Sequence, residues 1–89
     1  MIIESKKLGT FLTSRPDGRE AFYTIRSYFN QKNSNEKLIL DFKDVEVVAP
    51  SWLDEVLTNL EIEYGPDQVE LINNDNVSIQ EALKVMKKG

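Results

Sequence analysis

The run Leu38-Ile39-Leu40, followed after one aspartate by Phe42, constrains the fold more than any other stretch of the chain. Its apolar residues are continuous and do not alternate with polar ones. Such runs are typical of strands covered on both faces, as in parallel α/β sheets. Lys43 and Asp44 then turn the chain, and an amphipathic helix follows from Ser51. The sequence therefore predicts a buried central strand and a strand-to-helix corner at Ser51.

Three amphipathic patterns predict three helices. The first begins at Ser14-Arg15-Pro16-Asp17 and runs from about Pro16 to Gln31, because proline suits the first helical position and an acidic residue there complements the helix dipole. The second carries an apolar face that extends to Tyr64 and ends at Gly65-Pro66. The third begins near Ser78 and has the clearest apolar stripe.

Shorter apolar segments at Met1–Ile3 and Val69–Ile72 predict two further strands. Thr10–Thr13 is either a short strand or an ordered loop, and Glu46–Val48 is a brief extended piece. The resulting order, β-α-β-α-β-α with short connections, favours parallel strands and right-handed crossovers. We therefore predict one domain over residues 1–89, a small α/β sandwich whose largely parallel or mixed sheet is covered by helices.

Serines are also expected to cap the second and third helices. Ser51 fits an N-cap with Asp54 three residues later, a weaker variant of the capping box. Ser78 and Glu81 form a full capping box, and Val77 before them is expected to staple onto the helix.

The chain contains no histidine and no cysteine, and its formal net charge is −4. It therefore lacks the commonest general base, thiolate metal sites, disulfides and any Ser-His type triad. Its negative charge argues against nucleic acid as the main partner, because phosphate binding needs a clustered basic surface. No apolar stretch approaches the length of a membrane span. We expect a cytoplasmic, non-enzymatic protein that uses no metal or cofactor and does not contact membranes.

Ser51 and Trp52 each have two interpretations. Ser51 is a plain N-cap, worth about 1 kcal/mol, or a phosphoacceptor. A phosphate at a helix N-terminus is stabilised by the dipole, and its repulsion by Asp54 and Glu55 could release a docked partner. Trp52 lies off the main apolar stripe and is either an exposed anchor for a partner or a residue at the edge of the core.

Other candidate residues also leave alternatives open. Ser14 and Arg15 are a helix cap and a surface arginine, or Arg15 binds an anion or an acidic group of a partner. Asp41 or Asp54 could serve a phosphotransfer or ligand-binding domain, but a receiver-type site needs more acidic partners and a lysine near the last strand. We rank protein docking first and keep self-association, for instance as a homodimer, as a third alternative. The predicted docking residues are Ser14, Arg15, Ser51, Trp52, Asp54 and Glu55.

Several short motifs also occur in a fixed order along the chain. They are Leu8-Gly9, Thr13-Ser14-Arg15 with Ala21 behind it, Leu40-Asp41-Phe42-Lys43-Asp44-Val45, Ser51-Trp52-Leu53-Asp54-Glu55-Val56 and Ile72-Asn73-Asn74-Asp75-Asn76-Val77. Together they resemble the small bacterial STAS-like domains of unknown function, distant relatives of the anti-sigma factor antagonists. The resemblance covers about Leu8 to Met86.

This resemblance implies a STAS-like fold and a non-enzymatic regulatory role. Members of the wider group dock on a protein partner, typically a histidine-kinase-like ATPase that serves as anti-sigma factor or serine kinase. In classical members an Asp-Ser-Ser-Gly motif begins the second helix, and its first serine is phosphorylated. The matching residues here are Ala49-Pro50-Ser51-Trp52. The phosphoacceptor position is therefore Pro50, which cannot be phosphorylated, and Ser51 is the adjacent serine.

Overall fold

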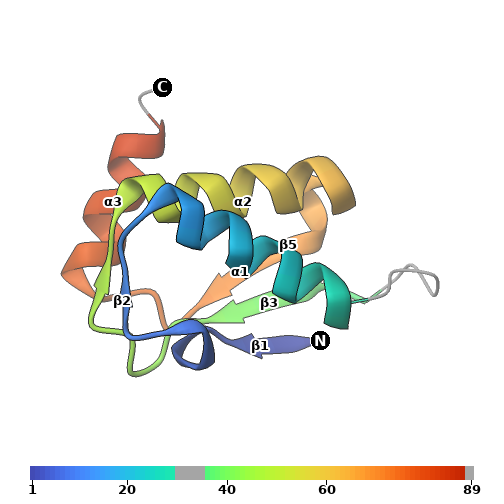
Figure 1. Cartoon of the computed structure of the whole chain (residues 1–89), viewed down its shortest axis with the longest axis horizontal. Helices are drawn as coiled ribbons and strands as arrows, with labels where there is room; N and C mark the ends of the chain where they lie inside the picture. Colours follow the sequence, from blue (N-terminus) through green and yellow to red (C-terminus); the bar gives the residue numbers. More distant parts are fainter. Residues whose placement is uncertain (30–35, 88–89) are drawn as a thin grey trace.

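The computed structural model describes residues 1–29 and 36–87 as a mixed α/β structure (Figure 1). Its strands are β1 (Ile2–Glu4), β2 (Phe11–Leu12), β3 (Leu38–Asp41), β4 (Val47–Val48) and β5 (Val69–Ile72). Its helices are α1 (Arg15–Tyr28), α2 (Pro50–Tyr64) and α3 (Val77–Lys87), and short 3-10 turns lie at Ser5–Leu8 and Pro66–Gln68. The predicted fold class is confirmed.

The strands form two small parallel sheets. One has three strands in the order β1-β3-β5, with Ile2 beside Ile39 and Leu40 beside Leu71. The other pairs β2 with β4 and places Phe11 beside Val47. The run that begins at Leu38 is therefore the central strand, as predicted. The open alternative at Thr10–Thr13 is decided in favour of a short strand.

Helices cover one face of the three-stranded sheet. Figure 1 shows α1 and α2 on the same side of it, and Leu38 and Leu40 are fully buried on that side. At the alternate positions Ile39 is partly exposed and Ile2 is 58% exposed. The expectation that β3 is covered on both faces is wrong. Because the spatial order β1-β3-β5 runs in one direction, right-handed crossovers place both connecting helices on one face.

The first two helices approach each other closely at Gly18. A Cβ atom added to this residue would lie 2.8 Å from the carbonyl oxygen of Trp52 and 3.0 Å from Cβ of Glu55. Glycine therefore lets α1 contact the backbone of α2. Around this crossing, Ile25 of α1 and Leu53 of α2 are completely buried. The core thus lies between the two helices and the sheet beneath them.

The ends of α1 and α3 differ from the sequence-based expectation. α1 ends at Tyr28, whereas the predicted last residue, Gln31, lies outside the described residues. At α3, Oδ1 of Asn76 accepts a hydrogen bond from the Ser78 backbone N–H at 2.7 Å. The Ser78 hydroxyl instead accepts from Val48 N at 2.8 Å and donates to Val48 O at 3.0 Å. The predicted capping box is therefore wrong, because this hydroxyl joins α3 to β4.

The expected hydrophobic staple before α3 is also wrong. Val77 is the first residue of α3, and its side chain is 76% exposed. A staple requires an apolar residue that packs against the following turn. Burial of α3 instead depends on Ile79 and Ala82, which are both fully buried.

Candidate functional site

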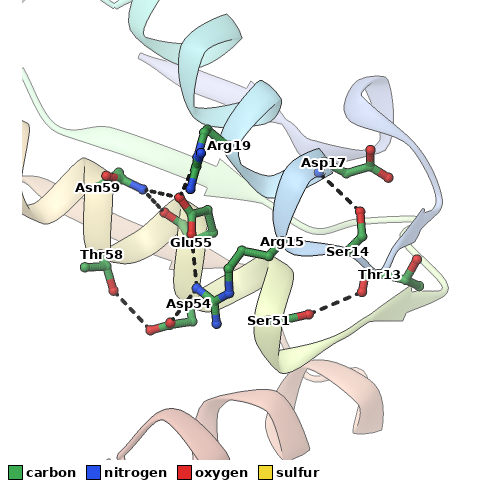
Figure 2. Close-up of polar contacts among 10 residues, drawn as sticks. All are labelled: Thr13, Ser14, Arg15, Asp17, Arg19, Ser51, Asp54, Glu55, Thr58 and Asn59. Atoms are coloured by element: carbon green, nitrogen blue, oxygen red, sulfur yellow. Dashed lines mark hydrogen bonds and ion pairs between the residues drawn. The ribbon is translucent and has the colours of Figure 1, made fainter.

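The first turns of α1 and α2 form a polar corner, which comprises Thr13, Ser14, Arg15, Ser51, Asp54 and Glu55 (Figure 2). Five of the six predicted docking residues lie in this corner. Ser14 has an extended backbone, and its Oγ accepts a hydrogen bond from Asp17 N at 3.2 Å. Its predicted role as the N-cap of α1 is confirmed.

Arg15 links the two helices. Its Nη1 atom lies 3.0 Å from Oδ2 of Asp54 and 3.0 Å from Oε1 of Glu55 (Figure 2). Both contacts are made by Nη1, and the Arg15 side chain is 48% exposed. Its pairing with two carboxylates of the same chain was not among the alternatives considered from sequence.

Two residues that the sequence analysis missed complete this cluster. Arg19 Nε donates to Oε2 of Glu55 at 3.2 Å, and Asn59 Nδ2 donates to the same oxygen at 3.0 Å. Arg19 lies one helical turn after Arg15, and Asn59 lies one turn after Glu55. Helical spacing alone could therefore have placed each of them beside a predicted site residue.

The contacts in this cluster favour the charged forms of Glu55 and Arg15. Hydrogen bonds from Arg15 lower the pKa of Glu55 below its usual range, although burial of that side chain opposes the shift. The same contacts, first with Glu55 and then with Asp54, raise the pKa of Arg15. The Glu55 side chain is only 11% exposed, so this ion pair is better shielded from water than the one with Asp54.

Ser51 is not the N-cap of α2. Pro50 occupies the first helical position, which makes Ala49 the cap residue, and alanine has no side chain that can accept a hydrogen bond. The hydroxyl of Ser51 donates to the carbonyl oxygen of Thr13 at 3.3 Å. The expected capping partner, Asp54, contacts Arg15 and accepts from Thr58 instead.

Trp52 lies in the core. Trp52 is only 1% exposed, and its carbonyl oxygen is the atom nearest to a Cβ added at Gly18. Of the two sequence-based alternatives, packing in the core is correct and the exposed anchor is wrong.

Asp41 serves the turn after β3. Its Oδ1 atom accepts from Nδ2 of Asn73 at 2.8 Å and from the backbone N–H of Lys43 at 3.0 Å. These bonds lower the pKa of Asp41, with the Asn73 contact first. Asp41 and Asp54 thus belong to separate clusters with different partners. Within residues 1–29 and 36–87, no three acidic side chains are grouped in a way that could hold a metal ion.

The corner combines internal ion pairs with residues at its outer side that face solvent. Thr13 and Pro50 are exposed and Ser51 is partly exposed. Such an arrangement offers a fixed surface for recognition. Among the described helices, none has the length and apolar character needed to cross a membrane.

The parallel sheet, the helices on one face and the corner at the start of α2 define a small α/β domain of the STAS type. The family described as a STAS-like domain of unknown function matches residues 17–78, which is more than half of the chain. The chain therefore belongs to this family, and the resemblance noted from its motifs is confirmed. No curated protein and no solved structure gives a significant match.

Proposed function

We propose that this chain is a non-enzymatic regulatory module of the cytoplasm that docks on a protein partner through the polar corner. The partner class we favour is a histidine-kinase-like ATPase, as for the anti-sigma factor antagonists to which the family is distantly related. The observation that carries this proposal is the position of Ser51. It lies in the first turn of α2, partly exposed, directly after Pro50, which matches the phosphorylated serine of classical members.

The outer groups of the corner are suited to a partner. The bond from the Ser51 hydroxyl to Thr13 O is long for an O–H···O contact, at 3.3 Å. A partner that supplies a better acceptor can therefore take over this hydroxyl at small cost. Pro50 and Thr13 flank it and are exposed. Docking here would bury only groups that already face solvent.

The inner groups of the corner hold this surface in one shape. Arg15 ties α1 to two carboxylates of α2, and Gly18 keeps the helices in contact one turn further along. A partner then has little conformational freedom to remove on binding, and such preorganisation favours affinity.

Phosphorylation of Ser51 would change both charge and pairing at this surface. A phosphoserine carries about −1.5 to −2 charges at neutral pH. Asp54 lies one turn further along α2 and would repel it, and the phosphate would compete with that carboxylate for Arg15. We therefore expect modification to release the partner.

The test is affinity capture from the native host, with bound proteins identified by mass spectrometry. Ser51→Asp is compared with wild type and with Ser27→Asp, which introduces the same change on an exposed residue of α1. We expect wild type and Ser27→Asp to capture the same ATPase and Ser51→Asp to lose it while remaining folded. Equal capture by all three proteins would mean that the corner is not the docking surface.

A further inference from the structure

The outer edge of β1 is a second surface that the corner does not use. In the part of the chain that the structure describes, β1 has β3 on one side and no strand on the other. Ile39 N donates to Met1 O at 2.8 Å, so the backbone groups of Met1 point toward β3. Because successive residues point these groups to opposite edges of a strand, the N–H and C=O of Ile2 face the open edge. They can pair with another extended segment.

A groove of about 760 Å³ runs along this open edge, between β1 and α1. We call it the edge groove. Its apolar lining comes from β1, α1 and the 3-10 turn between them and consists of Ile2, Ile3, Leu8, Ile25 and Tyr28. Ile2 and Tyr28 are mostly exposed, Tyr28 to 66%. Apolar side chains of a bound segment that pack against Ile2 or Tyr28 would be removed from water together with them.

Acidic groups dominate the border of the edge groove. Glu4 and Asp41 line it side by side, since they are register partners in β1 and β3. Beyond Leu8 the groove continues into a second hollow, to which Asp17 and Glu20 contribute. Lys7 is the basic residue in both linings, and it is paired with Glu4 at 3.2 Å. The carboxylates therefore outnumber the ammonium groups along the whole path.

We propose that the edge groove binds an extended cationic segment of a protein partner, which adds a strand to β1. Side chains of an added strand alternate between the two faces of the sheet. On the helical face they would contact Tyr28, which favours apolar residues. On the other face they would contact Glu4 and Asp41, which favours lysine or arginine. The preferred segment thus alternates apolar and basic residues.

Two further observations fit this ligand chemistry. Hydrogen bonds from Asn73 and from the backbone of Lys43 lower the pKa of Asp41, so this carboxylate stays charged. Glu4 is the neighbouring carboxylate in the register and is also accessible from the groove. This surface is distinct from the polar corner, so its binding does not depend on the function proposed for Ser51.

The probe is a short end-blocked peptide of alternating valine and lysine, and the matched control peptide carries glutamate in place of lysine. Binding to the purified protein is measured by fluorescence anisotropy, and the affected amides are located by NMR. We expect the lysine peptide to bind, to perturb the amides of Ile2 and Glu4 and to weaken with added salt. Equal binding of both peptides, or no binding of either, would overturn the proposal.

Variants then locate the site. Ile2→Lys places a positive charge at the open edge and Tyr28→Ser removes apolar lining, so each should weaken binding by about tenfold or more. Ile62→Lys is the matched control, because Ile62 is 77% exposed on α2 and does not line the groove. Equal loss in Ile62→Lys would refute the site. A wild-type mass that rises with concentration and falls to the monomer in Ile2→Lys would show that a second copy occupies the edge.

Discussion

At the scale of single residues, the corner is built from contacts between positions that are distant in the sequence. Arg15 contacts Asp54 and Glu55, and the Ser51 hydroxyl contacts Thr13. Local patterns could identify Ser14 as a cap, because its partner lies three residues away. They could not identify the partners of Arg15 or Ser51, since these depend on how α1 crosses α2.

Ser5 offers a test at this scale. The residue is completely buried, and among the described residues its hydroxyl has no hydrogen-bond partner. Ser5→Ala removes this unpaired group, so we expect the free energy of unfolding to rise by about 1 kcal/mol. Urea unfolding measures the change, with the exposed Ser27→Ala as the control. A less stable Ser5→Ala protein would mean that the hydroxyl is paired.

At the scale of elements, periodicity predicted the helices and the central strand, but it did not predict their ends. Because Pro50 occupies the first helical position, the N-cap of α2 is Ala49 and not Ser51. The Ser78 hydroxyl accepts a hydrogen bond from Val48 of β4 and does not cap α3. The crossing of α1 and α2 illustrates the same limit. The apolar stripe of α2 shows which side meets the sheet, whereas the side covered by α1 follows from Gly18, which carries no apolar signal.

Gly18→Ala tests the helix crossing. In an ordinary helix this change would stabilise the protein by up to about 1 kcal/mol. Here the added methyl group would meet the backbone oxygen of Trp52 at 2.8 Å. We therefore expect a loss of about 1–3 kcal/mol, as for overpacked sites, measured by urea unfolding. Thr24→Ala, at an exposed position of the same helix, is the control. A gain in stability at Gly18 would contradict the close crossing.

Ser78→Ala tests the junction between α3 and β4. The change leaves Val48 N and Val48 O without their side-chain partner in a partly buried region. We expect a loss of about 1–3 kcal/mol. The capping-box interpretation would instead place the loss at the start of α3 and leave the Val48 amide unaffected. Hydrogen exchange at that amide distinguishes the two, because only loss of the junction accelerates it.

At the scale of the whole molecule, the carboxylates make stability depend on pH. The pKa values of Glu55 and Asp41 are lowered from ordinary values of 4.5 and 3.8. A lowered pKa in the folded state contributes stability that is present above the ordinary value and is lost as the pH falls through the folded value. We therefore expect the wild type to lose stability as the pH falls below the ordinary pKa values of these two carboxyl groups.

Glu55→Gln separates the contribution of Glu55 to this pH dependence from that of the other carboxyl groups. The variant should be less stable than wild type at neutral pH, because Arg15 and Arg19 lose a charged partner. It should also lose less stability on acidification, since one titrating group is gone. Thermal unfolding from neutral to acidic pH provides the measurement. Parallel curves for the two proteins would show that Glu55 does not contribute to the acid transition.

The strand order has a consequence for how the chain reaches its folded state. Each of β1, β3 and β5 pairs only with a strand that lies beyond an intervening helix, and the same holds for β2 with β4. The sheets therefore contain no hairpin that could form early from neighbouring residues. Their ladders close only after long loops are ordered, which makes folding slow relative to a helical bundle of this size. Within residues 1–29 and 36–87, the two strands of each pair are always separated by a helix, so a short fragment cannot contain both.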